Sequence, residues 1–172
     1  MNKYQLFHSL ALGFGCKFGF YSPTLDPTSI FEHTMGDQFS VAERSAIMRR
    51  VRSVDTEPEL RIRKMVHQLG FRFRLHGKAL PGKPDLVFSR RKQAVFVHGC
   101  YWHQHHCYAS KRPRTNRRYW NRKLDRNIER DKENLRLLKQ QGWRVLIIWE
   151  CELRKPGQLQ RRLLRFLLSG AA

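Results

Sequence analysis

Three short apolar runs constrain the fold of this chain more than any other feature. They read PDLVF at 84–88, AVFVH at 94–98 and RVLIIWE at 144–150. Only the polar turn at 89–92 separates the first two runs, so this pair predicts a β-hairpin. A long helical stretch from about 116 to 141 precedes the third run, which is typical of a buried strand. Strands and helices in this order favour an α/β fold.

Two capping-box patterns predict helices ahead of these strands. In Ser40-x-x-Glu43 and again in Thr56-x-x-Glu59, a hydroxyl residue is followed three positions later by a glutamate. Such a pair satisfies N–H groups that have no partner at the start of a helix. The second helix carries apolar residues at helical spacing, and we expect it to end at Gly70.

The remaining signals complete one domain. The stretch FRFRL at 71–75 alternates as a strand does, and a basic helix from about 157 to 168 closes the chain. We therefore expect one α/β domain over 39–172, with a central mixed sheet flanked by helices. Residues 1–38 are rich in Phe, Gly, Ser and Pro without a convincing period. They are predicted to form a poorly ordered N-terminal appendage.

The charge of the chain indicates the class of partner. Lys and Arg number 34 against 14 acidic residues, which gives a net charge of +20 and a pI near 10.8. Such a field attracts polyanions and favours nucleic acid, although a general basic protein such as a ribosomal component has the same charge. The sequence holds no apolar run long enough to span a membrane, so we expect a cytoplasmic protein without membrane partners. Thiols in that compartment are free or metal-bound.

The loop VHGCYWHQHHC at 97–107 predicts a metal site. Three potential ligands lie in this loop and a fourth follows the last strand: Cys100, His105, Cys107 and Cys151. Three thiols and one imidazole make the donor set of a tetrahedral structural zinc ion. His106 or His98 is an alternative nitrogen ligand. The other interpretation is that the thiols are inert and buried beside a solvated histidine cluster.

The same loop carries aromatic side chains that a metal site does not explain. A loop held rigid by an ion can present Tyr101 and Trp102 outward, beside basic residues, for insertion between base pairs. The alternative is that Trp102 and Trp120 cover the core.

Acidic residues in apolar surroundings suggest a second metal site. Asp85 begins an apolar strand, and Asp131 lies on the apolar face of the long helix. Glu59 shares a helix face with apolar residues, although its place in the capping box also accounts for it. Converging carboxylates suit Mg²⁺, which polarises a phosphodiester and activates water. His103 is a suitable general base, because histidine titrates near neutral pH.

Four segments in this order closely resemble one enzyme family. LPGKPDLVF, FVHGCYWHQHHC, YWNRKLDRNIERD and GWRVLIIWEC are similar to the very short patch repair DNA mismatch endonucleases, relatives of the restriction endonuclease fold. The resemblance runs from about Glu43 to the C-terminus. It implies a Mg²⁺-dependent enzyme that nicks duplex DNA 5′ to the thymine of a T:G mismatch, the product of 5-methylcytosine deamination. It also implies a monomer that acts at the nucleoid, with mismatch-repair proteins as further partners.

The resemblance assigns roles to individual residues. Asp85 and the main-chain carbonyl of Val97 would bind Mg²⁺, and His103 would be the catalytic histidine. Asp131 would orient that histidine, and Glu59 would be a supporting acid. The family's structural zinc ligands match the four residues named above. The aromatic side chains that wedge into the duplex correspond to Tyr101, Trp102 and Trp120.

This sequence departs from the family pattern at two positions. Val97 stands where better-known members have threonine, so a role that needs only the carbonyl survives and a hydroxyl role is lost. Gln104 replaces one imidazole of the histidine run, with little effect expected. The lysine of the usual restriction-enzyme pattern is also absent after Asp85, which favours a histidine mechanism. Two rival functions are a restriction-type nuclease that cuts intact duplex and a non-catalytic zinc-stabilised DNA-binding module.

Overall fold

A four-stranded mixed sheet forms the centre of the protein. The computed structural model describes residues 41–52 and 54–169. The strands lie in the order β1-β2-β3-β4, with antiparallel pairing from β1 to β3 and parallel pairing of β3 with β4. Their bounds are Arg74–Leu75 (β1), Leu86–Phe88 (β2), Gln93–His98 (β3) and Arg144–Trp149 (β4). The mixed sheet predicted from the sequence is confirmed.

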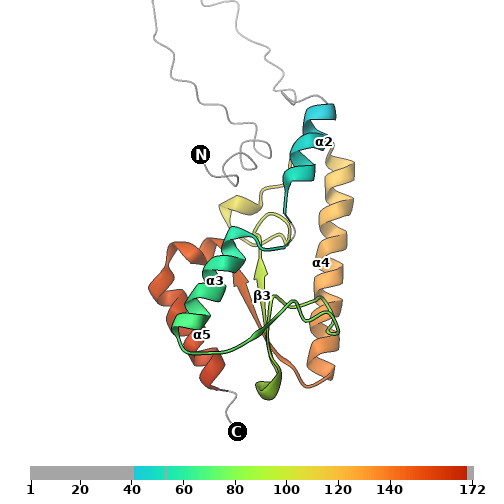
Figure 1. Cartoon of the computed structure of the whole chain (residues 1–172). Coiled ribbons are helices and arrows are strands. Elements are labelled where there is room, and N and C mark those ends of the chain that lie inside the picture. Colours follow the sequence, from blue (N-terminus) through green and yellow to red (C-terminus); the bar gives the residue numbers. More distant parts are fainter. Residues whose placement is uncertain (1–40, 53, 170–172) are drawn as a thin grey trace, which may run out of the picture.

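Helices cover both faces of this sheet. Their bounds are Val41–Arg50 (α2), Glu57–Gln68 (α3), Arg117–Gln140 (α4) and Pro156–Leu168 (α5). Helices α3 and α5 lie on one side of the sheet and α4 lies on the other (Figure 1). The three-layer arrangement follows from the apolar stripe on each helix, which must be buried against a sheet face.

The main core lies between the sheet and the layer of α3 and α5. Leu159, Leu163 and Leu167 repeat every four residues on α5 and are almost fully buried. They pack with Ile62 and Val66 of α3. Burial of each such side chain contributes about 1.5–3 kcal/mol to folding, so this layer holds the sheet in place.

The predicted hairpin and the end of the long helix are both confirmed. A short 3-10 turn at Ser89–Arg91 joins β2 to β3, and Lys92 after it adopts the left-handed conformation. Helix α4 ends just before Gly142, whose φ of 77° suits glycine at this position. Strand β1 is shorter than the predicted 71–75, since only Arg74 and Leu75 pair with β2, and Phe71 and Phe73 before it pack against the core.

Helix α3 begins where the Thr56 pattern predicts, but its first turn differs from a reciprocal capping box. The Thr56 hydroxyl caps no backbone N–H and instead donates to Glu59 at 2.8 Å. The second Glu59 oxygen accepts from the backbone N–H of Asp55 at 3.0 Å. Glu59 therefore receives the hydrogen bonds at this helix start.

Some predictions fall outside the described residues. The N-terminal appendage of 1–38 and the capping residue Ser40 lie there, so the domain boundary stays a prediction. Among the described helices, none has the length and apolar character that crossing a membrane requires.

Candidate active site

The predicted site residues gather at one end of the sheet. Strand β3 ends at His98, and the loop after it carries His103. Because β2 runs antiparallel to β3, Asp85 at its start lies at this same end. Strand β4 runs parallel to β3, so Cys151 just after it also lies there. Segments far apart in the sequence therefore meet beyond the end of β3.

Asp85 lies against the backbone of Val97. Its Oδ2 accepts a hydrogen bond from the Val97 N–H at 2.7 Å. The N–H and C=O of a strand residue point to the same side, so the Val97 carbonyl faces the Asp85 side of β3. Burial, together with the nearby Glu59 carboxylate, raises the pKa of Asp85 to about 6 although the Val97 hydrogen bond lowers it. A cation held by these two groups would offset the cost of that buried charge.

Glu59 is buried, with 4% of its surface exposed, and its carboxylate is already held by three donors. Besides Asp55 and Thr56, the Arg63 guanidinium donates to it at 3.0 Å. Arg63 also pairs with Asp55 at 2.6 Å and lies 3.4 Å from the His76 ring nitrogen. Glu59, the predicted supporting acid, thus lies near Asp85, and its charge is balanced by Arg63. The sequence patterns did not indicate this partner.

His103 and Asp131 form a direct pair. The His103 Nδ1 lies 2.5 Å from Asp131 Oδ2, which joins the loop to the middle of α4. If Asp131 is ionised, it accepts from Nδ1–H, which leaves the lone pair of the other ring nitrogen as a proton acceptor. The pairing predicted by the family resemblance is therefore present in the geometry.

His98 lies directly against this pair. Its ring stacks on His103 with centroids 3.8 Å apart and planes 11° from parallel. The His98 side chain is buried, and its Nδ1 has no hydrogen-bond partner. Burial, aided by the charge of His103, lowers the pKa of His98 to about 3, so the ring is neutral near pH 7. The sequence patterns offered His98 only as an alternative zinc ligand, and its actual neighbours are His103 and Asp131.

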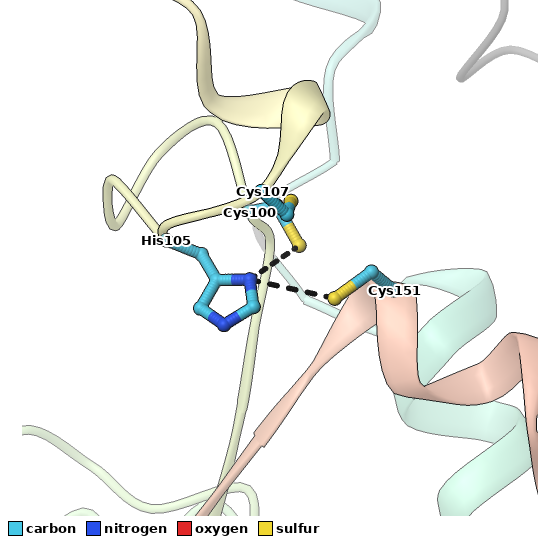
Figure 2. Close-up of side chains that lie close together, drawn as sticks. All are labelled: Cys100, His105, Cys107 and Cys151. Atoms are coloured by element: carbon cyan, nitrogen blue, oxygen red, sulfur yellow. Dashed lines mark hydrogen bonds between the residues drawn. The ribbon is translucent and has the colours of Figure 1, made fainter.

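Four predicted ligands converge in a separate thiol cluster, defined as Cys100, His105, Cys107 and Cys151. Figure 2 shows one nitrogen of the His105 ring facing the sulfurs of Cys100, from the loop, and of Cys151, from the segment after β4. The His105 Nδ1 lies 3.8 Å from the Cys100 sulfur and 3.4 Å from that of Cys151. A tetrahedral ion with bonds of about 2.3 Å to sulfur and about 2.0–2.1 Å to nitrogen places these atoms roughly 3.5 Å apart. The spacing of this donor set fits such an ion.

The thiol cluster fixes the loop to the end of the sheet. Burial raises the pKa of both the Cys100 and the Cys151 thiols above the usual value, so they stay protonated without an ion. A bound cation would displace these protons and join β4 to the loop. His106, one of the alternative nitrogen ligands, is exposed and lies outside the cluster.

The predicted wedge residues form one aromatic cluster, defined as Tyr101, Trp102, Tyr119 and Trp120. The Tyr101 ring lies 5.1 Å from Trp102 and 5.8 Å from Trp120. The Lys123 ammonium lies 5.2 Å from the Trp102 ring and 5.4 Å from the Trp120 ring. Tyr101 is buried, with 9% of its surface exposed, so its side chain belongs to the packed interior. The indoles of Trp102 and Trp120 are half-buried. Tyr119 and Lys123 were not found from the sequence patterns.

Gln104 organises the loop more than the sequence indicated. It adopts a φ of 51°, and its side-chain amide donates to the carbonyls of Tyr101 at 2.8 Å and Ser110 at 3.2 Å. Its side-chain oxygen accepts from Arg112 at 2.8 Å. The sequence analysis treated Gln104 as a neutral replacement and missed this structural role.

Comparisons with known proteins identify the family. The model of a family described as DNA mismatch endonuclease Vsr matches residues 36–109. The type II nicking enzyme V.XorIIP of Xanthomonas oryzae is 44% identical over 133 residues, 77% of this chain and 98% of that protein. The DNA mismatch endonuclease Vsr of Escherichia coli is 42% identical over 125 residues, 73% of this chain and 80% of that protein.

A solved structure resembles the fold. The catalytic domain of the homing endonuclease I-Bth0305I covers 69% of this chain and all of its own length, with a TM-score of 0.51 and 23% identity. Together with the mixed sheet and its helices, this likeness confirms the predicted nuclease fold.

Proposed function

Because the chain belongs to the very short patch repair (Vsr) family, it is a mismatch-specific DNA endonuclease, and we propose that it nicks duplex DNA 5′ to the thymine of a T:G mismatch. The observation that carries this proposal is the His103–Asp131 pair at the strand end that also holds Asp85. A pure DNA-binding module has no use for an oriented histidine and a partly buried acid at the same end of the sheet.

The proposed chemistry is hydrolysis with His103 as the general base. His103 takes the proton of the attacking water on the ring nitrogen that Asp131 does not contact. Asp131 holds the ring in the required tautomer and stabilises the imidazolium that forms. The neutral His98 ring, stacked on His103, adds no competing positive charge at this site.

Magnesium is the proposed catalytic cofactor. Asp85 and the main-chain carbonyl of Val97 would hold Mg²⁺, since both are oxygen donors and lie on the same side of β3. When bound, the ion polarises the phosphodiester and lowers the pKa of water. Arg63 holds Glu59 in place beside this site, which limits the negative charge around Asp85.

Zinc is the proposed structural ion of the thiol cluster. Three thiols and one imidazole form the donor set, and the measured separations fit a tetrahedral ion. His103 and Trp102 lie between ligands in the sequence, so the ion would hold both a base and a wedge in one orientation.

Mismatch selectivity is proposed to come from the aromatic cluster. A T:G wobble pair stacks and pairs less well than a Watson–Crick pair, so separating its base steps costs less. The half-buried Trp102 and Trp120 have ring surface available for stacking, with Tyr101 packed behind them. We further propose that the protein acts as a monomer at the bacterial nucleoid in the cytoplasm, with mismatch-repair proteins as partners. A nick in one strand requires only one active site.

The test uses end-labelled duplexes that carry T:G, T:A or C:G at one position in a methylation-type pentanucleotide context. The protein, loaded with zinc, is incubated with each duplex in EDTA, Ca²⁺ or Mg²⁺, and the products are sized on a denaturing gel. We expect Mg²⁺-dependent nicking of the thymine strand of T:G alone, directly 5′ to the thymine. Cleavage of all three duplexes would support the restriction-type rival, and binding without cleavage would support the non-catalytic module.

A further inference from the structure

A basic hollow lies where the loop meets the start of α4. It encloses about 500 Å³ and is lined by Arg112, Pro113, Arg114, Arg117 and Asn121. We call it the arginine hollow. Three guanidinium groups around one depression form a strongly positive site, and the lining contains no acidic side chain. Arginine is well suited to phosphate, because its planar fork can donate two parallel hydrogen bonds.

Arg112 is fixed in this hollow by three partners. Its Nε donates to Gln104 at 2.8 Å and one terminal nitrogen donates to Asn121 at 3.1 Å. The other terminal nitrogen contacts Asp125, whose side chain is 57% exposed. An ion pair so exposed contributes little and is readily exchanged. A phosphate can therefore replace Asp125, while Gln104 and Asn121 keep the guanidinium in place.

The other two arginines have no competing anion. In the part of the chain that the structure describes, no carboxylate pairs with Arg114 or Arg117, and both side chains are exposed. Arg117 is the first residue of α4, and Asn116 before it makes no side-chain capping bond. The N–H groups of the first helical turn therefore add to the positive field of the three side chains.

The arginine hollow connects to the candidate active site through Gln104. The amide that holds Arg112 also binds the carbonyls of Tyr101 and Ser110, so it links the hollow to the loop that carries His103. Asn121 follows Trp120 of the aromatic cluster in the sequence. A strand that passes the aromatic cluster would lie beside this hollow.

We propose that the arginine hollow is a subsite for a backbone phosphate of the duplex, and that its occupation fixes the His103 loop through Arg112 and Gln104. This inference rests on the proposed function, because it takes duplex DNA as the ligand. The phosphate is read by charge and shape, so the subsite contributes affinity and position without base preference.

The first experiment measures binding as a function of salt. Fluorescence anisotropy in Ca²⁺ gives affinities for a T:G duplex and a matched T:A duplex with the wild-type protein, Arg114→Gln, Arg117→Gln and the double variant. We expect each single variant to weaken both affinities about 3–10-fold, and the double variant to lower the salt slope by about 0.9, the value for one phosphate.

Arg90→Gln is the matched control, because it removes the same charge from an exposed arginine in the turn at the opposite end of β3. We expect it to change affinity less than twofold. An equal loss in Arg90→Gln would overturn the subsite, since it would show that only the overall field acts. Wild-type affinity in the double variant would overturn it too, and would leave an acidic protein segment as the ligand to examine at this hollow.

The second experiment tests the coupling through Gln104. Gln104→Glu keeps an oxygen for Arg112 but removes the amide donor to Tyr101 and Ser110. In Mg²⁺ we expect kcat for T:G nicking to fall about tenfold with KM nearly unchanged, whereas Arg117→Gln should raise KM. Zinc content and Tm show whether each variant is folded. If Gln104→Glu unfolds, Gln104→Leu removes both the amide donor and the oxygen, and the same fall in kcat is expected.

The outcomes separate this inference from the proposed function. An unchanged kcat in a folded Gln104→Glu would overturn the coupling. A wild-type protein that binds duplex through the hollow but never nicks would overturn the proposed catalysis and leave the phosphate subsite standing. A wild-type protein that nicks T:G while both arginine variants bind normally would overturn the subsite alone.

Discussion

Two clusters of potential metal ligands lie at the same end of the sheet and differ in how far their side chains are exposed to solvent. The thiol cluster takes all four ligands from the protein, and Cys100 in it is almost fully buried. The acid–histidine cluster of His98, His103 and Asp131 remains partly open, with 24% of the His103 side chain and 20% of the Asp131 side chain exposed, and Asp85 lies at the same end of the sheet. A closed site stabilises a fold, whereas an open site leaves positions for water and substrate.

The two clusters are nevertheless interleaved in the sequence. His103 lies between Cys100 and His105, so one loop supplies both a closed site and an open one. We infer from this arrangement that the position of His103 depends on the stability of its neighbours. Substitutions should therefore separate into those that lower stability and activity together and those that lower activity alone.

The largest expected effect is loss of the thiol cluster. Cys151→Ser should remove zinc and lower the free energy of unfolding by several kcal/mol, because a structural zinc ion contributes about 10–16 kcal/mol of apparent binding energy. Zinc content by atomic absorption and unfolding in urea measure this. Cys16→Ser is the control, because Cys16 is the one cysteine of the sequence outside the thiol cluster, and this variant should keep one zinc ion per protein. Unchanged zinc in Cys151→Ser would remove that residue from the ligand set.

Asp85→Asn should lower activity without lowering stability. We expect the nicking rate to fall about a thousandfold or more, equivalent to about 4 kcal/mol, since the proposed Mg²⁺ site loses its carboxylate. Tm should stay the same or rise, because a buried charge is removed. Single-turnover nicking, a melting curve and T:G duplex binding in Ca²⁺ test this. A folded variant that loses duplex binding as well would contradict the assignment.

Asp131→Asn should give a smaller loss of activity. The amide no longer stabilises the imidazolium and offers a donor to the His103 ring, so the rate should fall about a hundredfold, or about 2.7 kcal/mol. Single-turnover nicking of the T:G duplex measures this loss. Glu129→Gln, on the same helix and exposed, is the control for a change of charge on α4. Equal losses in both variants would argue against an orienting role for Asp131.

Long periodic elements and acids in apolar runs were predictable from the sequence. Helices α4 and α5 and strand β4 match their predicted positions, because each carries a sustained apolar pattern. Asp85 and Asp131 were recognisable because a carboxylate on an apolar face is costly unless it has a partner. The chain brings both to the same end of the sheet.

Residues whose role depends on distant neighbours were not predictable in this way. Arg63 lies on a helix where a basic residue usually faces solvent, and only folding brings His76 and the Asp85 region to it. Gln104 became informative only when its contacts with Arg112 and Ser110 were visible. His98 reads as the end of an apolar strand, and its stacking on His103 requires the loop to fold back.

The smallest expected effect concerns stability without Mg²⁺. The free energy of unfolding should differ between Asp85→Asn and the wild type by an amount that depends on pH. The folded pKa of Asp85, about 6, lies above its ordinary value of 3.8, so the folded state holds an extra proton between these values. Its charged form therefore destabilises the fold above about pH 6 and not below about pH 4. His98 acts in the opposite sense: its folded pKa, near 3, lies below 6.5, so stability is lost as pH falls through this range.

Both proteins share the His98 contribution and the thiol cluster, so their difference isolates Asp85. Urea unfolding at pH 4, 5, 6 and 7 should show Asp85→Asn more stable than the wild type by roughly 1–2 kcal/mol at pH 7, and the advantage should shrink towards zero at pH 4. Asp125→Asn should show the opposite trend, because the Arg112 hydrogen bond lowers the pKa of that exposed carboxyl. A constant difference across this range for Asp85→Asn would mean that Asp85 is ionised in the folded protein as it is in the unfolded chain. The Asp85 carboxylate would then already be balanced electrostatically by Arg63 and His76, without a cation.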